Sequence, residues 1–132
     1  MKPGLHRLIP VLALLTLSSF GSALEEVVSA IRTGDYARIS KHFDEVVTIA
    51  IDERSNTFGR SQSEMVLRDF FSQHPVKDFT VERQLEEGTG YFTGILHAGG
   101  LRFRTTVLMR QRGDRKRIRE LRFERLEGLP RP

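Results

Sequence analysis

Side chains that could do chemistry are scattered along this chain and form no recognisable catalytic or metal-binding motif. The sequence has four histidines and no cysteine, and no two histidines stand at the spacing that lets one helix face hold zinc. Asp52 and Glu53 are adjacent, so their carboxylates point apart in a turn instead of converging on calcium. No serine stands between paired glycines as in a nucleophile elbow. We therefore expect no metal, no cofactor and no catalytic residue set, and we interpret the chain as a protein that is not an enzyme.

Charge is the second chemical feature, and it is unevenly distributed. Residues 24–101 hold 8 basic and 13 acidic residues, whereas residues 102–125 hold 10 basic and 3 acidic ones. The basic segment could form an anion-binding face, or it could pair with the acidic half across a sheet. We favour the pairing interpretation. Nucleic acid is not the expected partner, because the basic segment lacks the aromatic residues on which single strands stack.

The N-terminal 23 residues are typical of a secretory signal peptide. Lys2, His6 and Arg7 are followed by the mostly apolar stretch Leu8–Phe20 and by the small residues Gly21-Ser22-Ala23. The stretch is too short to span a bilayer, so no stable membrane span is expected. A buried N-terminal helix is the alternative. Export without cysteine favours a periplasmic or extracellular protein, with residues 24–126 as one α+β domain and residues 127–132 as a C-terminal tail.

Apolar spacing predicts helices in the first half of this domain. Residues 24–33 carry one apolar stripe that Gly34 ends, and Asp35 can cap a second short helix. Residues 46–51 read as a strand, residues 52–56 as a polar turn and residues 57–59 as a return strand. Ser61 and Glu64 have the spacing of a capping box, and the helix that they open stops at Pro75, after His74.

Four strands are expected in the second half, at residues 77–85, 91–98, 101–111 and 115–126. Gly99-Gly100 and Gly113-Asp114 join the last three as tight hairpins, so that Ala98 faces Leu101. If the strand pairing set by the Gly113-Asp114 turn continued without interruption, Glu120 would lie in the core, where an unpaired charge is costly. A β-bulge near Arg119 and Glu120 removes this conflict.

The same register predicts a contact face on the outer side of the sheet. Apolar residues lie at its centre and basic residues around them: Tyr91, Ile95 and Leu108, with His97, Arg102, Arg104, Arg110, Arg119 and Arg122. A half-apolar face with a charged rim suggests a partner surface, and a two-fold homodimer is the expected use. A solvated face with scattered apolar residues is the alternative.

The order of these elements resembles a known family. The residues that carry the resemblance are Ala30-Ile31, Gly34-Asp35, Ile39-Ser40, Phe43, Arg60-Ser61-Gln62, Asp69-Phe70-Phe71, Gly94, Phe103-Arg104 and Leu121-Arg122-Phe123. They are similar to domain-of-unknown-function family 4783, an uncharacterised family of short exported bacterial proteins in the nuclear-transport-factor-2-like (cystatin-like α+β) superfamily. Ser63 stands where alanine is expected. The resemblance implies a cone: N-terminal helices, a short β-hairpin, one capped helix and a curved four-stranded antiparallel sheet.

Enzymes of that superfamily place an aspartate or histidine base and a tyrosine or acid donor inside the cone. The resemblance therefore suggests Asp44 or His42 as a base. The residues themselves favour other roles, because His42 follows Lys41 near a helix end and Asp44 fits a turn or cap. Tyr36 is expected in the core or at its lip, while His97 and Tyr91 lie outside the cone by register.

Three functions remain open at this point. The first is a non-enzymatic exported module that binds a small apolar or weakly acidic ligand in the cone, or a protein partner on the outer face. The second is an isomerase- or dehydratase-like enzyme that uses Asp44 or His42. The third is an envelope protein that binds a polyanion through its arginine-rich sheet face.

Overall fold

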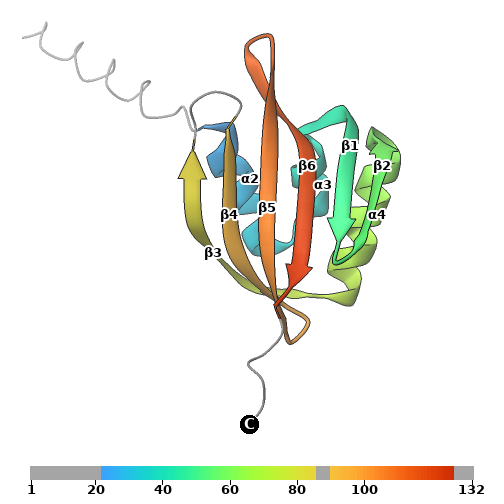
Figure 1. Cartoon of the computed structure of the whole chain (residues 1–132), viewed down its shortest axis with the longest axis vertical. Helices are drawn as coiled ribbons and strands as arrows, with labels where there is room; N and C mark the ends of the chain where they lie inside the picture. The colour runs from blue at the N-terminus through green and yellow to red at the C-terminus, as the bar shows by residue number, and fades with distance from the viewer. Residues whose placement is uncertain (1–21, 86–89, 127–132) are drawn as a thin grey trace, which may run out of the picture.

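The computed structural model describes residues 22–85 and 90–126 (Figure 1). The expected leader falls outside this part except for Ser22 and Ala23, and the expected tail, residues 127–132, falls outside it entirely. Export and the cleavage site therefore stay predictions. Within the two described ranges, no helix is long and apolar enough to cross a membrane.

Gly34 and Asp35 have the roles that the sequence predicts at the ends of the first two helices, and Ser22 is an N-cap that was not predicted. Helix α2 (Ala23–Thr33) starts when the Ser22 hydroxyl accepts a hydrogen bond from the backbone N–H of Glu25, and it ends at Gly34, which has a φ of 67°. Helix α3 (Tyr36–Ser40) begins at Asp35, whose carboxylate accepts from the backbone N–H of Arg38.

The strands form one six-stranded mixed sheet, and the prediction of a four-stranded antiparallel sheet with a separate hairpin is wrong. The strands are β1 (Phe43–Ile51), β2 (Arg54–Gly59), β3 (Val76–Leu85), β4 (Tyr91–Ala98), β5 (Leu101–Arg112) and β6 (Arg115–Arg125), in the order β2-β1-β6-β5-β4-β3. β1 pairs with β6 in parallel, and the other neighbours are antiparallel. The hairpin joins the sheet because β1 satisfies the backbone N–H and C=O groups that would otherwise line an open edge of β6.

The register of β4, β5 and β6 is confirmed. Ala98 faces Leu101. At the second turn Arg112 faces Arg115. The register shifts between Leu108 and Met109, so Leu108 faces Glu120 on the outer side and Arg119 is the extra residue of the predicted bulge.

Helix α4 (Arg60–Gln73) does not have the predicted capping box. Its N-cap is Gly59, which offers no side-chain hydrogen bond, and Ser61 is already the second helical residue. β2 ends at Gly59 and α4 begins directly after it, at Arg60. The helix therefore starts two residues earlier than the Ser-x-x-Glu pattern indicates, since that pattern would make Ser61 the N-cap. The buried hydroxyl of Ser63 instead donates to the carbonyl of Gly59 at 2.8 Å.

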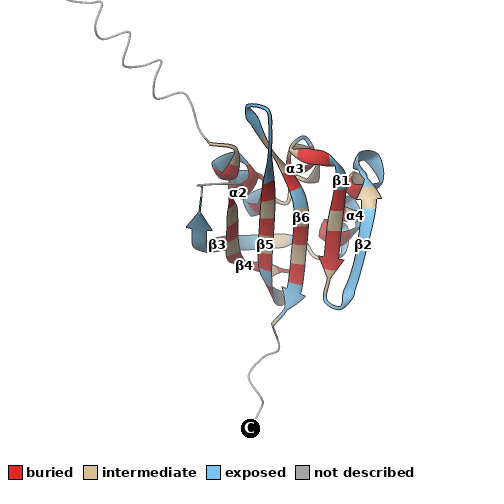
Figure 2. Cartoon of the chain, turned by 45° about the horizontal axis from the view of Figure 1, so that its top comes forward, coloured by how far each residue is buried: buried red, intermediate tan, exposed pale blue. Residues whose placement is uncertain are grey.

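The core lies between the helices and one face of the sheet (Figures 1 and 2). The inward side chains of the strands alternate with outward ones, and the core is rich in phenylalanine: Phe43, Phe70, Phe71, Phe79, Phe92, Phe103 and Phe123. Gly94 makes room for Phe79, because a Cβ atom at Gly94 would lie 2.7 Å from the ring. No described helix covers the opposite face of the sheet (Figure 1).

Candidate functional site

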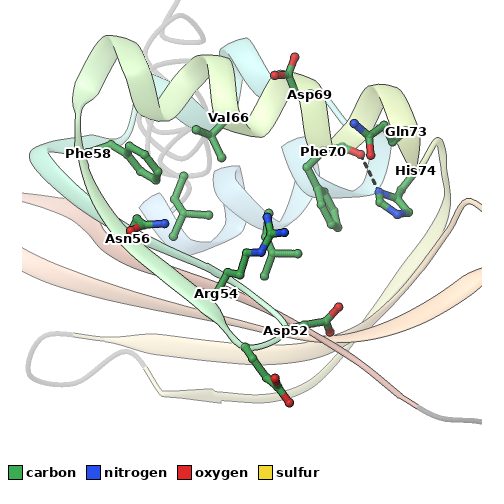
Figure 3. A pocket seen from close by; sticks show the side chains of 12 residues that line it. Asp52, Arg54, Asn56, Phe58, Val66, Asp69, Phe70, Gln73 and His74 are labelled. Atoms are coloured by element: carbon green, nitrogen blue, oxygen red, sulfur yellow. Dashed lines mark hydrogen bonds between the residues drawn. The ribbon is translucent and has the colours of Figure 1, made fainter.

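A cavity of about 570 Å³ opens between the β1–β2 hairpin and helix α4. Its size falls in the range that accommodates small organic ligands. One wall is apolar and comes from both layers: Ile49, Ile51, Phe58, Val66 and Phe70. The rim is polar, with Asp52, Glu53, Arg54, Asn56, Asp69, Gln73 and His74 (Figure 3).

The periodicity of strand β2 and of helix α4 explains why their side chains point into the same cavity. Arg54, Asn56 and Phe58 alternate along β2, so their side chains share the face that looks toward α4. On α4, Val66, Phe70 and His74 are spaced by four residues and form one stripe. The two sets therefore face each other across the opening (Figure 3).

The floor of the cavity is rigidly packed. The Phe70 ring stacks on Phe123 with centroids 4.2 Å apart, and its edge meets Phe103 at 5.2 Å. Aromatic pairs in these geometries stabilise a fold beyond the area that they bury. A ligand would therefore rest on a preformed apolar surface.

His74 presents a hydrogen-bond acceptor at the rim. It is the C-cap of α4, and its Nδ1 lies 2.9 Å from the carbonyl oxygen of Phe70 (Figure 3). A carbonyl only accepts, so the proton of the neutral ring sits on Nδ1 and Nε2 keeps its lone pair. The ring also lies against Phe70, with centroids 4.6 Å apart, which fixes its orientation.

Arg54 provides the positive charge of the cavity. Its side chain reaches from β2 across the opening toward α4 (Figure 3). The nearby carboxylates are directed elsewhere: Asp52 accepts from the backbone N–H of Arg125 at 2.8 Å, and Asp69 points away from the cavity. Among residues 22–85 and 90–126, no carboxylate forms an ion pair with Arg54.

The two suggested bases both have partners and lie away from this cavity. Asp44 is not a turn or cap residue, because it belongs to β1, and its side chain is only 7% exposed. Its carboxylate lies 3.1 Å from Nε of Arg112 and 4.0 Å from a terminal nitrogen of Arg110. His42 is half-buried rather than solvated, and its Nε2 is 2.9 Å from a carboxylate oxygen of Glu26. Tyr36 packs against the edge of the core, as predicted.

The predicted contact-face residues do share the outer side of the sheet. Tyr91, Ile95 and Leu108 are each half-buried, and Ile95 faces Arg104 as expected. His97, on the same face, contacts Asp78 at 2.6 Å. A homodimer through this face stays a prediction.

Several arginines of that face pair with acidic residues. Arg104 lies 3.8 Å from Glu82, and Arg122 lies 2.6 Å from Glu120. Arg110 approaches Asp44, as described above. Arg102 and Arg119 form no ion pair with the part of the chain that the structure describes. The predicted pairing between the acidic and basic halves therefore occurs at Arg104, Arg110 and Arg112.

The described residues contain no group of three or more histidine, aspartate or glutamate side chains that could hold a metal ion.

The sequence did not predict the cavity between the β1–β2 hairpin and α4. Residues 52–56 read as a polar turn because residues 52–57 contain no apolar side chain whose alternation would indicate a strand, so the sequence offered no signal for the first part of β2.

Comparison with known proteins gives the family and the fold. The model of the DUF4783 family, a domain of unknown function, matches residues 24–124. The crystal structure of a DUF4783 family protein from Bacteroides uniformis ATCC 8492 is similar with a TM-score of 0.78 and 24% identity, over 81% of this chain and 100% of that one. A second DUF4783 family protein, from Bacteroides fragilis YCH46, gives a TM-score of 0.73 and 25% identity over 76% of this chain and 96% of that one.

More distant structures share the fold. An NTF2-like protein of unknown function from Cytophaga hutchinsonii ATCC 33406 has a TM-score of 0.58 and 14% identity, over 82% of this chain and 94% of that one. No curated protein matches the chain. The two Bacteroides structures above are DUF4783 family proteins, and their fold is similar to that of this chain. The family match over residues 24–124 shows that this chain belongs to the DUF4783 family.

Proposed function

We propose that this chain is a binding module that takes a small ligand with an apolar body and one acidic group in the cavity between β1–β2 and α4. The observation that carries the proposal is the position of Arg54, which extends over an apolar wall and forms no ion pair within the described residues. A carboxylate of the ligand would pair with the guanidinium, since charge-assisted hydrogen bonds are the strong ones. The apolar body would cover Phe58, Val66 and Phe70.

The ligand would lie at the side of the cone rather than inside it. The space under α2 and the sheet is filled by core side chains such as Val27, Phe92 and Leu96, which are all fully buried. Asn56, Gln73 and His74 offer donors and acceptors around the rim. Such a few polar groups around an apolar pocket fix a ligand's orientation and provide its specificity.

The test uses two probes of the same shape, 2-naphthoate and the uncharged 2-naphthalenemethanol, with binding followed by calorimetry or by NMR shifts. The Arg54→Gln variant should bind naphthoate about tenfold or more weakly, because a charge-assisted hydrogen bond is lost. Its affinity for the alcohol should be unchanged. The Val66→Phe variant, which fills the cavity, should weaken both probes.

The matched control is Arg60→Gln, which removes an exposed arginine from the start of α4, outside the cavity lining. It should bind both probes as the wild type does. Equal naphthoate affinity in Arg54→Gln and wild type would contradict the proposal.

A further inference from the structure

The β5–β6 hairpin ends in a concentrated group of basic residues. The segment from Arg110 to Arg117 holds five basic residues and one acidic residue, Asp114, and no apolar residue. Met109 and Ile118 are the last buried pair of the hairpin, with exposures of 1% and 0%. Beyond that pair the strands extend past the body of the molecule and are largely exposed (Figures 1 and 2).

Four arginines lie on one side of this hairpin in two directly opposed pairs. Arg110 faces Arg117, and Arg112 faces Arg115. Strand alternation places all four on the side that continues the outer face of the sheet. Like charges directly opposite each other destabilise a sheet. We call these four residues the arginine tetrad.

One carboxylate compensates part of this charge. The Asp44 carboxylate forms ion pairs with Arg110 and Arg112. Arg117 donates a hydrogen bond to the carbonyl oxygen of Lys41. Residues 110–117 add one acidic residue, Asp114, and one further basic residue, Lys116, and Lys41 at the end of α3 is also basic. The tip therefore keeps a surplus of positive charge after its own contacts are made.

Natural sequences break a local rule of stability mainly where function requires it. Two like-charge pairs on an exposed hairpin with no apolar burial are such a violation. From this arrangement we propose that the arginine tetrad docks the protein on a membrane surface that carries anionic phospholipid headgroups.

The shape of the site favours an extended surface over a small anion. The tetrad stands on a projecting hairpin and not in a hollow, so it meets a flat partner before the rest of the molecule does (Figure 1).

The docking is electrostatic. The tip has no apolar side chain to insert, so the arginines would remain among the headgroups and salt would release the protein. Each basic residue near an anionic bilayer contributes about fivefold in affinity, as a general expectation.

The experiment measures co-sedimentation of the chain beginning at Ser22 with phosphatidylcholine vesicles that do or do not contain phosphatidylglycerol. Wild type should bind only the anionic vesicles, and high salt should release it. The Arg115→Glu/Arg117→Glu variant turns both opposed pairs into opposite-charge pairs. Its thermal stability should be equal to or higher than that of wild type, while its binding should fall by about 25-fold or more.

The control is Arg102→Glu/Arg125→Glu, which makes the same change of net charge at the far end of the same two strands. It should keep at least most of the binding. Equal loss in the two double variants would overturn the proposal, because it would show a response to net charge alone. Absence of binding to anionic vesicles at low salt would also overturn it, as would binding to inorganic polyphosphate but not to lipid. The single Arg115→Glu variant, whose side chain has no partner in the described chain, gives the same answer if the double variant fails to fold.

Discussion

The carboxylate of Asp44 lies 3.1 Å from Nε of Arg112, although 68 residues separate them in the sequence. Asp44 sits on β1 and Arg112 at the tip of β5, so their contact passes over the intervening strand β6. Asp44 also accepts a hydrogen bond from the backbone N–H of Glu45. The pair ties the exposed hairpin tip to the body of the sheet.

Replacing this carboxylate should loosen the hairpin and destabilise the protein. We expect Asp44→Asn to lower the free energy of unfolding by about 1–2 kcal/mol, because hydrogen bonds to a charged group are lost while the half-exposed arginines remain hydrated. Chemical denaturation measures this value, and amide exchange in residues 110–117 should become faster.

Glu45→Gln is the matched control, because it removes the same charge from the adjacent, exposed position. It should change stability by no more than a few tenths of a kcal/mol. If Asp44→Asn were no less stable than Glu45→Gln, the contact would have no structural role.

Gly94 is a position where adding a single Cβ atom should reduce stability. A Cβ atom there would lie 2.6 Å from the carbonyl oxygen of Thr80 and 2.7 Å from the ring of Phe79. Backbone on the neighbouring strand β3 cannot move away without disturbing its pairing with β4, so Gly94→Ala should cost about 1–3 kcal/mol. Thermal unfolding followed by circular dichroism measures the loss.

The comparison for this change is Gly59→Ala, since a Cβ atom at Gly59 meets nothing within 4 Å. The Gly59 variant should lose less stability than the Gly94 variant, namely about 0.5–1 kcal/mol, because alanine is a poorer N-cap than glycine. A Gly94 variant as stable as the Gly59 variant would mean that Phe79 and Thr80 adjust freely.

The register of the last three strands could be predicted because local chemistry determines it. Gly99 and Gly100 both have positive φ, which a two-residue hairpin turn requires, and the turn then fixes every pair back to Tyr91 and Leu108. The bulge could be predicted because Glu120 would otherwise enter the core. Both inferences depend on neighbours in sequence and on the cost of burying a charge.

The pairing of β1 with β6 could not be predicted in the same way. It joins residues such as Ile49 and Leu121 that are far apart in the chain, and no turn connects them. The cavity depends on that pairing, because it places the β1–β2 hairpin opposite α4. Arg54 belongs to β2, an exposed edge strand with mostly polar residues. The sequence of this segment therefore resembled that of a polar turn.

The missing cap of α4 gives the last prediction. Gly59 has φ and ψ of −71° and 170°, the extended backbone of an N-cap, but no side chain to accept from the first turn. Gly59→Asp should therefore raise the free energy of unfolding by about 0.5–1 kcal/mol, through a cap hydrogen bond and the favourable helix dipole. Gly59→Ala adds a side chain without an acceptor and should give no such gain, while Ser61→Ala should be nearly neutral because Ser61 is not the cap. Denaturant titration of the three variants measures these differences. A clear loss of stability in Ser61→Ala, with no gain in Gly59→Asp, would instead place the start of the helix at Ser61, since only a residue at the N-cap can accept from the free N–H groups of the first turn.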